Sequence, residues 1–221
     1  MLFRSDEPGG AFRARLPAEY VLCVGTLEAR KNHLLLLNLW RQLADELGDA
    51  VPRLFLIGQR GWETENAIDM LERCPALRGV VFERKNVRDD EAARLAQGAQ
   101  ALLLPSFAEG FGFPLVEALA LGVPVLCSNL AALRENGGDV PEYLDPLDGL
   151  GWRSAVIDYA LPASPRRAAQ LGRLSGWRAP SWQDHFAAVE ALIAETQSIG
   201  QYETESPPDL WFNARQTADM R

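Results

Sequence analysis

The residues best suited to chemistry lie within 105–122, where the sequence reads PSFAEGFGFPLVEALALG. Glu109 and Glu117 stand eight positions apart in this segment. A carboxylate can accept hydrogen bonds from two adjacent hydroxyls, which suits the diol of a ribose or a hexose. Gly110 and Gly112 allow positive φ and let the backbone approach a ligand without a Cβ in the way. We therefore expect a turn that brings both carboxylates to one crevice.

A helix is expected to begin at Pro114, because proline suits the first helical position, where its missing N–H costs nothing. A helix N-terminus offers free N–H groups and a partial positive charge, so a diphosphate can bind there. Each feature also has an ordinary explanation. Glu117 can simply complement the helix dipole, Glu109 can be a solvated loop charge, and the glycines can mark an ordinary turn. The turn alone leaves these alternatives open.

A second loop, within residues 24–37, reads VGTLEARKNHLLLL and carries Arg30 and Lys31 directly before an expected helix. Cations are favoured at the opposite end of a helix, so this pair does little for the fold. Binding an anion would explain the two charges, and a solvated surface pair is the alternative. The loop lacks the G-x-G-x-x-G pattern, and the chain has no G-x-x-x-x-G-K-[ST] loop. Dehydrogenase and phosphate-loop NTPase functions are disfavoured accordingly.

The elements that must position these loops alternate along the chain. Five short apolar runs predict strands buried on both faces, at 20–25, 53–58, 79–83, 101–104 and 123–128. Helical patterns fill the gaps at 63–73, 89–97, 114–121 and 131–136, and Asn32 is expected to cap the helix after the first strand by accepting a backbone N–H. Strict alternation predicts a Rossmann-like, doubly wound parallel sheet, with the ligand beyond the carboxyl ends of its strands.

The ends of the chain differ from this alternating region. Residues 1–19 mix charges with Pro and Gly and predict a lead-in, and residues 20–199 form the expected domain. The domain should end in helices, the last one capped by Ser181 with Asp184 completing an approximate capping box. Residues 200–221 are polar except for Leu210, Trp211 and Phe212, so this tail is expected to be disordered or to dock on a missing domain.

Length and composition limit the number of domains and the classes of partner that the protein can bind. With 221 residues, 48% of them hydrophobic, the chain can hold one main domain. A formal net charge of -8 disfavours a general nucleic-acid surface. The three cysteines contain no CxxC pair and suggest reduced thiols, and no apolar run approaches the ~20 residues of a membrane helix. A cytoplasmic protein is expected, with peripheral attachment at the inner membrane face in a longer protein left open.

Several motifs of the sequence resemble those of a known protein family. EGFGFPLVEALALG, with Glu109 and Glu117, is similar to the E-x7-E motif of retaining glycosyltransferases of the GT-B fold. VGTLEARKN resembles the G-[RT]-L-x-x-x-K-[GN] loop of glycosyltransferase family 4. IGQRGW, PVLCSNLAALRE and SWQDHF also resemble landmarks of that family in the same order, so the resemblance covers roughly residues 20–193.

The resemblance implies roles for matching residues. Glu109 would be the catalytic residue that accepts hydroxyls of the donor sugar, and Glu117 would hold the ribose diol. The implied donor-binding set is Arg30, Lys31, Gly110, Phe111, Gly112, Leu115 and Glu117. The sequence departs from the family pattern in two places that would contact the donor. Thr26 stands where many members have an Arg that contacts phosphate, and the loop around Val87, FERKNVRDDE, lacks the glycine that helps to hold the base.

The function implied is the C-terminal, donor-binding half of a GT-B hexosyltransferase that transfers mannose or glucose from a GDP- or UDP-sugar to a glycan or lipid-linked acceptor, in polysaccharide biosynthesis. No metal or other cofactor is expected, because cations and a helix terminus stabilise the leaving diphosphate. Without the N-terminal domain, the chain should transfer nothing alone. A non-catalytic sugar-nucleotide-binding or scaffolding module and a sugar-nucleotide epimerase are the alternatives.

Overall fold

The computed structural model describes residues 20–202, and the chain divides into two units after Ala179. The first unit holds the sheet and seven of the described α-helices, and the second holds helix α9 (Trp182–Tyr202). The expected lead-in and the apolar trio Leu210, Trp211 and Phe212 lie outside the described residues. Those two expectations stay predictions.

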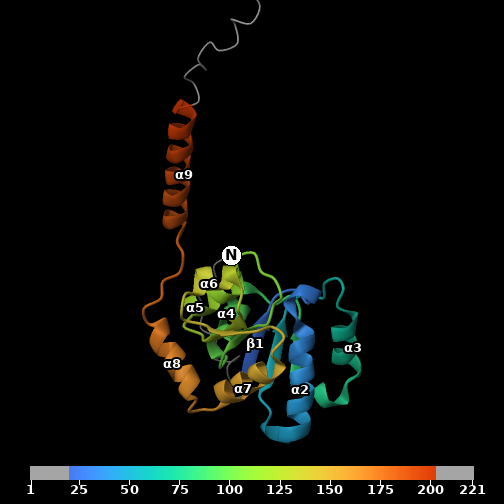
Figure 1. The fold of residues 1–221 in the computed structure, drawn as a ribbon. Helices are drawn as coiled ribbons and strands as arrows, with labels where there is room; N and C mark the ends of the chain where they lie inside the picture. Colours follow the sequence, from blue (N-terminus) through green and yellow to red (C-terminus); the bar gives the residue numbers. More distant parts are fainter. Residues whose placement is uncertain (1–19, 203–221) are drawn as a thin grey trace, which may run out of the picture. The chain divides into compact units, whose positions relative to one another are not determined.

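The sheet has six parallel strands in the order β3-β2-β1-β4-β5-β6 (Figure 1). The five predicted strands are confirmed within two residues at each end, and the structure adds a sixth. Their bounds are β1 (Tyr20–Val24), β2 (Arg53–Ile57), β3 (Val81–Arg84), β4 (Leu102–Leu104), β5 (Val125–Ser128) and β6 (Glu142–Leu144). The Rossmann-like, doubly wound prediction is therefore confirmed.

Strand β6 was missed by the sequence analysis because its signal is weak. It is only three residues long, reads EYL, and lies half-buried at the edge of the sheet. An edge strand needs no continuous apolar run, since one side of it does not face a neighbouring strand. Its place is set by pairing with β5, where Cys127 lies opposite Tyr143.

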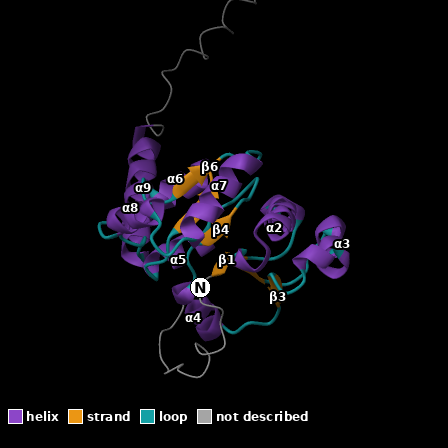
Figure 2. Cartoon of the chain, turned by 90° about the horizontal axis from the view of Figure 1, so that it is seen from below, coloured by secondary structure: helices purple, strands orange, loops and turns teal. Residues whose placement is uncertain are grey.

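Helices cover both faces of the sheet. Figure 2 shows α2 and α3 on one side and α4 and α5 on the other. One core cluster joins the sheet to α2, α3 and α7, and the other joins it to α4, α5 and α6. The helices of this unit are α2 (His33–Leu47), α3 (Glu65–Arg73), α4 (Asp89–Gly98), α5 (Phe113–Ala120), α6 (Ala131–Gly137), α7 (Gly149–Ala160) and α8 (Pro165–Leu174), with short 3-10 helices at Ala29–Lys31, Gly48–Ala50 and Pro75–Leu77.

Successive residues of one strand serve the two cores in turn. On β1, Val21 and Cys23 belong to the α2 side, whereas Tyr20 and Leu22 belong to the α4 side. This period of two follows from strand geometry, and burial on both faces explains why the central strands read as continuous apolar runs. The central strands are thereby fixed in register, and the loops at their carboxyl ends are held in place.

The predicted capping role of Asn32 is wrong. Asn32 does precede α2, but its backbone is left-handed, with φ of 55°, and its side chain accepts no N–H from the helix. Instead its buried amide donates to the carbonyl oxygens of Pro105 and Pro146, both at 3.1 Å. Asn is one of the few residues with a Cβ that tolerate this conformation readily. Asn32 therefore joins three loops at the carboxyl edge of the sheet.

The start of α5 differs in detail from the prediction. Gly112 has φ of 81° and directly precedes the helix, whereas Gly110 has no positive φ. The helix begins at Phe113, so Pro114 occupies its second position. A proline there still costs no hydrogen bond, because the first four helical N–H groups have no partner within the helix. Only one of the two glycines is thus required by backbone conformation.

The predicted capping box before α9 is confirmed. The Ser181 hydroxyl accepts from the Asp184 N–H at 3.1 Å, and the Asp184 carboxylate accepts from the Ser181 N–H at the same distance. The reciprocal pair satisfies two N–H groups at the helix start. This helix end could be read from the sequence because both partners are local.

Candidate functional site

The candidate site lies where the winding of the sheet reverses. Strands β1 and β4 are neighbours, with β2 and β3 on one side and β5 and β6 on the other. In such sheets the loops at the carboxyl ends of the two central strands diverge and leave a crevice for a ligand. Here the loops stay linked at one point, since the Phe107 N–H donates to the Arg30 carbonyl oxygen at 2.8 Å. The two predicted loops are therefore brought together.

A pocket of about 450 Å³ opens between these loops. Its volume lies within the range of small-molecule sites, roughly 300–1,000 Å³. The wall combines two cations, one carboxylate and the backbone of the turn before α5. The lining residues are Arg30, Lys31, Ala108, Glu109, Gly110, Phe111, Gly112, Phe113 and Pro114.

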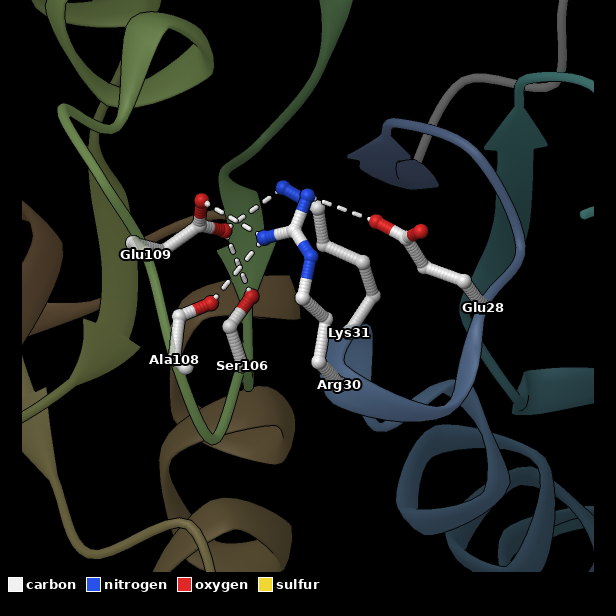
Figure 3. Close-up of polar contacts among 6 residues, drawn as sticks. All are labelled: Glu28, Arg30, Lys31, Ser106, Ala108 and Glu109. Carbon is white, nitrogen blue, oxygen red and sulfur yellow. Dashed lines mark hydrogen bonds and ion pairs between the residues drawn. The ribbon is translucent and has the colours of Figure 1, made fainter. Parts of the chain in front are cut away.

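Lys31 and Glu109 form the buried polar centre of the pocket wall (Figure 3). The Lys31 Nζ lies 2.6 Å from Glu109 Oε1, and the two side chains are 10% and 5% exposed. The Ser106 hydroxyl donates to the same oxygen at 2.7 Å. Short charge-assisted contacts with little exposure make a firm pair, because water screens them weakly.

Arg30 forms the exposed part of this cluster. Its Nη1 donates to Glu109 Oε2 at 3.3 Å and to the Ala108 carbonyl oxygen at 3.1 Å, and its Nη2 lies 2.6 Å from a Glu28 carboxylate oxygen. Nearly half of the Arg30 side chain is exposed. Two cations and two carboxylates therefore balance in charge, with Arg30 best placed to meet an arriving anion.

The start of α5 contributes fewer donors than the sequence suggested. Pro114 has no N–H, and the N–H groups of Leu115 and Val116 both donate to the Gly112 carbonyl oxygen, at 2.9 and 3.3 Å. The expected row of free N–H groups is thus partly used by the turn itself. Binding of an anion in this pocket would depend mainly on the side chains of Arg30 and Lys31.

Glu117 does not share the pocket of Glu109. It lines a small cavity of about 10 Å³ with Val24, Leu102 and residues of α4 and α5, and Pro114 lines both spaces. The single crevice expected for both carboxylates is therefore wrong: they lie in adjoining spaces. Burial raises the pKa of Glu117 to about 6, and the charge of Asp89 adds to the shift.

The raised pKa of Glu117 predicts a stability effect. The folded state disfavours the ionised form, so the free-energy cost of ionising Glu117 is present above pH 6 and disappears below the ordinary glutamate pKa of 4.5. Allowing for partial exposure, Glu117→Gln should raise the free energy of unfolding by about 1 kcal/mol at pH 8 and by nothing at pH 4. Urea unfolding at both pH values measures this. Glu135→Gln, exposed on α6, is the control, and an equal gain there would contradict the prediction.

Other expected site residues lie away from the pocket. The Leu115 side chain is fully buried in the core between α5 and the sheet. Thr26 is exposed, with its methyl group near Gly61 after β2. Val87 is half-buried against the α4-side core. The structure therefore brings together Arg30, Lys31, Glu109, Gly110, Phe111 and Gly112 of the predicted set, and it leaves the other members outside the pocket wall.

Sequence reasoning missed three contributors. Ser106 is buried and holds Glu109, Asn32 anchors Pro105 beside it, and Phe113 lines the pocket next to Phe111, with 4.7 Å between ring centroids. A hydroxyl three residues before Glu109 was a usable signal for Ser106, since short loops form such hydrogen bonds. The role of Asn32 had no local signal, because its partners lie far along the chain.

The buried groups behind the pocket are neutral. Burial lowers the pKa of His33 to about 4, with the Lys31 charge adding to the shift. Burial raises the pKa of Cys23 to about 12. Neither side chain competes with Lys31 or Glu109 for a charged partner near pH 7.

Within residues 20–202, no group of three or more His, Cys, Asp or Glu side chains is arranged to hold a metal ion. In the same part of the chain, no helix is long and apolar enough to cross a membrane.

Known proteins are similar to this chain in sequence. The sequence profile of the family described as "Glycosyl transferases group 1" matches residues 11–136. The O-antigen chain mannosyltransferase B of Escherichia coli is 33% identical over 183 residues, which is 83% of this chain and 45% of that protein. The serotype-specific mannosyltransferase WbdA of Escherichia coli is 32% identical over 130 residues, 59% of this chain and 16% of that protein.

A solved structure supports the fold. The crystal structure of a mutant of S. aureus TarM in complex with Fondaparinux, alpha-GlcNAc-glycerol and UDP is similar with a TM-score of 0.59 at 13% identity, over 78% of this chain and 33% of that one. This chain thus spans less than half the length of each of these relatives. The profile match covers more than half of the sequence. The chain therefore belongs to the family of group 1 glycosyl transferases.

Proposed function

We propose that this chain binds the sugar donor of a retaining GT-B glycosyltransferase of family 4. The observation that carries the proposal is the meeting of Arg30, Lys31 and Glu109 on two facing loops at the reversal point of the sheet. Cations bind a diphosphate, and a carboxylate binds hydroxyls. The trio thus suits a ligand in which a diphosphate and a sugar are joined.

Residues of this chain are assigned to three parts of the donor: the diphosphate, the sugar and the ribose. Lys31 and Arg30 bind the diphosphate, Glu109 accepts hydroxyls of the sugar, and the backbone from Gly110 to Gly112 lies against both. Glu117 accepts the hydroxyls of the ribose. The space now beside Glu117 is only about 10 Å³, so binding the ribose requires α4 and α5 to move apart or the ribose to approach from the surface of that cavity.

The bond exchange in the proposed reaction needs no oxidant, reductant or further co-reactant besides the two substrates. The acceptor hydroxyl oxygen forms a bond to the anomeric carbon as the bond from that carbon to the phosphate oxygen breaks. The bonding electrons leave with the diphosphate, which takes the acceptor proton on the same face. Arg30 and Lys31 stabilise the charge that develops on the leaving diphosphate. Metal independence is part of this proposal.

The sugar is proposed to be a hexose, mannose or glucose, carried by GDP or UDP and transferred to a glycan or lipid-linked acceptor. The names of the two Escherichia coli relatives favour mannose. We propose further that the acceptor site belongs to an N-terminal domain outside this chain, so that the chain binds the donor but transfers nothing alone. Sugar transfer by the isolated chain would contradict this part.

Titration calorimetry of GDP, UDP and ADP tests the proposal. The wild type should bind at least one of them, and Lys31→Ala, Arg30→Gln and Glu117→Ala should each weaken binding. Loss of a charge-assisted contact is expected to cost about 1.5–3 kcal/mol of binding free energy. Arg30→Gln is the most informative variant, because its half-exposed side chain can change without loss of the fold.

The matched control is Arg73→Gln on α3, whose exposed side chain pairs only with Asp69 among the ion pairs of the described chain. This variant has the same change in net charge as Arg30→Gln. Its nucleotide affinity should equal that of the wild type. Unchanged affinity in the Arg30, Lys31 and Glu117 variants would remove the basis for the site.

A further inference from the structure

The Glu109 carboxylate is held by three donors from three residues. Lys31 and the Ser106 hydroxyl both contact its Oε1, at 2.6 and 2.7 Å, and Arg30 donates to its Oε2 at 3.3 Å. Figure 3 shows the Glu109 side chain directed toward both cations across the gap between the loops. The carboxylate therefore occupies the position beside Lys31 and Arg30 that a phosphate would take.

The burial of Glu109 and Lys31 means that their charges act strongly on any anion that enters the site. The Glu109 side chain is only 5% exposed and that of Lys31 only 10% exposed, so water screens their charges weakly. An arriving anion that contacts Lys31 would lie close to the negative charge of Glu109. Two negative charges that lie close together repel each other strongly where little bulk water screens them. Glu109 thus opposes the binding of any anion that leaves it in place.

We propose that Glu109 is an internal competitor for the diphosphate site and thereby sets its specificity for sugar-bearing diphosphates. A diphosphate takes over Lys31 and Arg30, and the released carboxylate needs new donors. The hydroxyls of an attached sugar supply them, whereas a free diphosphate supplies none. This inference rests on the proposed function and deepens it, because it adds a penalty on the nucleotide product to a preference for the donor.

A substitution at Ser106 shows whether Glu109 weakens anion binding through the position of its carboxylate or only through its charge. Its hydroxyl is buried and donates to the Glu109 oxygen that Lys31 also contacts. Ser106→Ala keeps every charge and removes one donor that holds the carboxylate in the cation site. If Glu109 competes by its position, this neutral change should make displacement easier. A general field of negative charge would not respond to it.

Glu28 provides a matched control. It contacts Arg30 at 2.6 Å, so Glu28→Gln removes the same charge from the same cluster. Its partner Arg30 is nearly half exposed, and none of the ion pairs seen in the described residues joins Glu28 to Lys31. The Glu28 side chain is 14% exposed, so water and salt screen this pair more than the buried pair of Lys31 and Glu109, and its removal should change anion affinity less.

The experiment is titration calorimetry of the full chain with inorganic pyrophosphate, with GDP and GDP-mannose, and with UDP and UDP-glucose. Glu109→Gln should bind pyrophosphate and the free nucleotide about tenfold more tightly than the wild type, as removal of a like charge predicts. Ser106→Ala should gain about twofold to fivefold, and Glu28→Gln less than about twofold. The ratio of sugar-nucleotide to free-nucleotide affinity should fall about tenfold in Glu109→Gln.

Each of the other possible outcomes would contradict the inference, the proposed function or both. If Glu109→Gln binds pyrophosphate no more tightly than the wild type, Glu109 merely orients Lys31 and the inference is wrong, while Lys31-dependent nucleotide binding still supports the proposed function. An equal gain in Glu28→Gln would show a general charge effect and overturn the inference. If the wild type and Glu109→Gln both bind neither pyrophosphate nor nucleotide, the proposed function fails and the inference fails with it. Circular dichroism of each variant confirms folding first.

Discussion

Replacing Lys31 with Met should lower the free energy of unfolding by about 3–5 kcal/mol, because removal of one partner leaves a buried charge without its main counterion. Glu109 is only 5% exposed and would keep the Ser106 hydroxyl and the more distant Arg30 contact. A loss of this size is a large part of the stability of a typical domain. Urea unfolding at pH 7.5, followed by circular dichroism, measures it.

A double-mutant cycle shows whether the loss comes from the pair. Adding Glu109→Gln to Lys31→Met should recover at least about 1 kcal/mol, because a neutral amide is less costly to bury than a carboxylate. Arg73→Met is the control, since its exposed pair with Asp69 should be worth at most about 0.5 kcal/mol. No recovery in the double variant would mean that Lys31 stabilises the fold through its packing rather than through Glu109.

Asn32→Asp should lower the free energy of unfolding by about 3 kcal/mol or more, since it replaces a donor with a buried negative charge of the same shape. The amide of Asn32 donates to the carbonyl oxygens of Pro105 and Pro146, and an aspartate would face both of them as an unfavourable acceptor. Asn32→Gly should cost less, because glycine keeps the left-handed backbone and loses only the hydrogen bonds. Thermal and urea unfolding rank the two variants.

Asn38→Asp is the control for this charge change. Asn38 lies on α2, which Asn32 directly precedes, and its half-buried side chain donates an exposed hydrogen bond to the Leu34 carbonyl oxygen. Substitutions away from buried hydrogen-bond networks change stability within about 0.5 kcal/mol. If Asn32→Asp costs no more than Asn38→Asp, the bridge from Asn32 to the two proline carbonyls does not hold the loops together. Nucleotide affinity should fall together with stability, because Asn32 directly follows Arg30 and Lys31, the two cations proposed to bind the diphosphate.

The sequence was sufficient wherever the cause is local. Continuous apolar runs identified the five longer strands, since burial on both faces leaves that signature in each strand separately. The capping box at Ser181 was readable for the same reason, as both partners lie within one turn. The two loops that carry Arg30, Lys31 and Glu109 were also found, from residue types that do little for an ordinary loop or helix start.

Tertiary structure decided what depends on which strands are neighbours. Lys31 and Glu109 are 78 residues apart and meet only because β1 and β4 are adjacent at the reversal point of the sheet. The same adjacency turns Asn32 from an expected helix cap into a bridge between loops. Packing also places Glu109 and Glu117 in different spaces, which share Pro114 in their linings. Strand β6 likewise exists through its pairing with β5. Residue types and spacing thus determined which groups are available, and long-range packing decided which of them touch, because hydrogen bonds and ion pairs act over a few ångströms that the linear order does not specify.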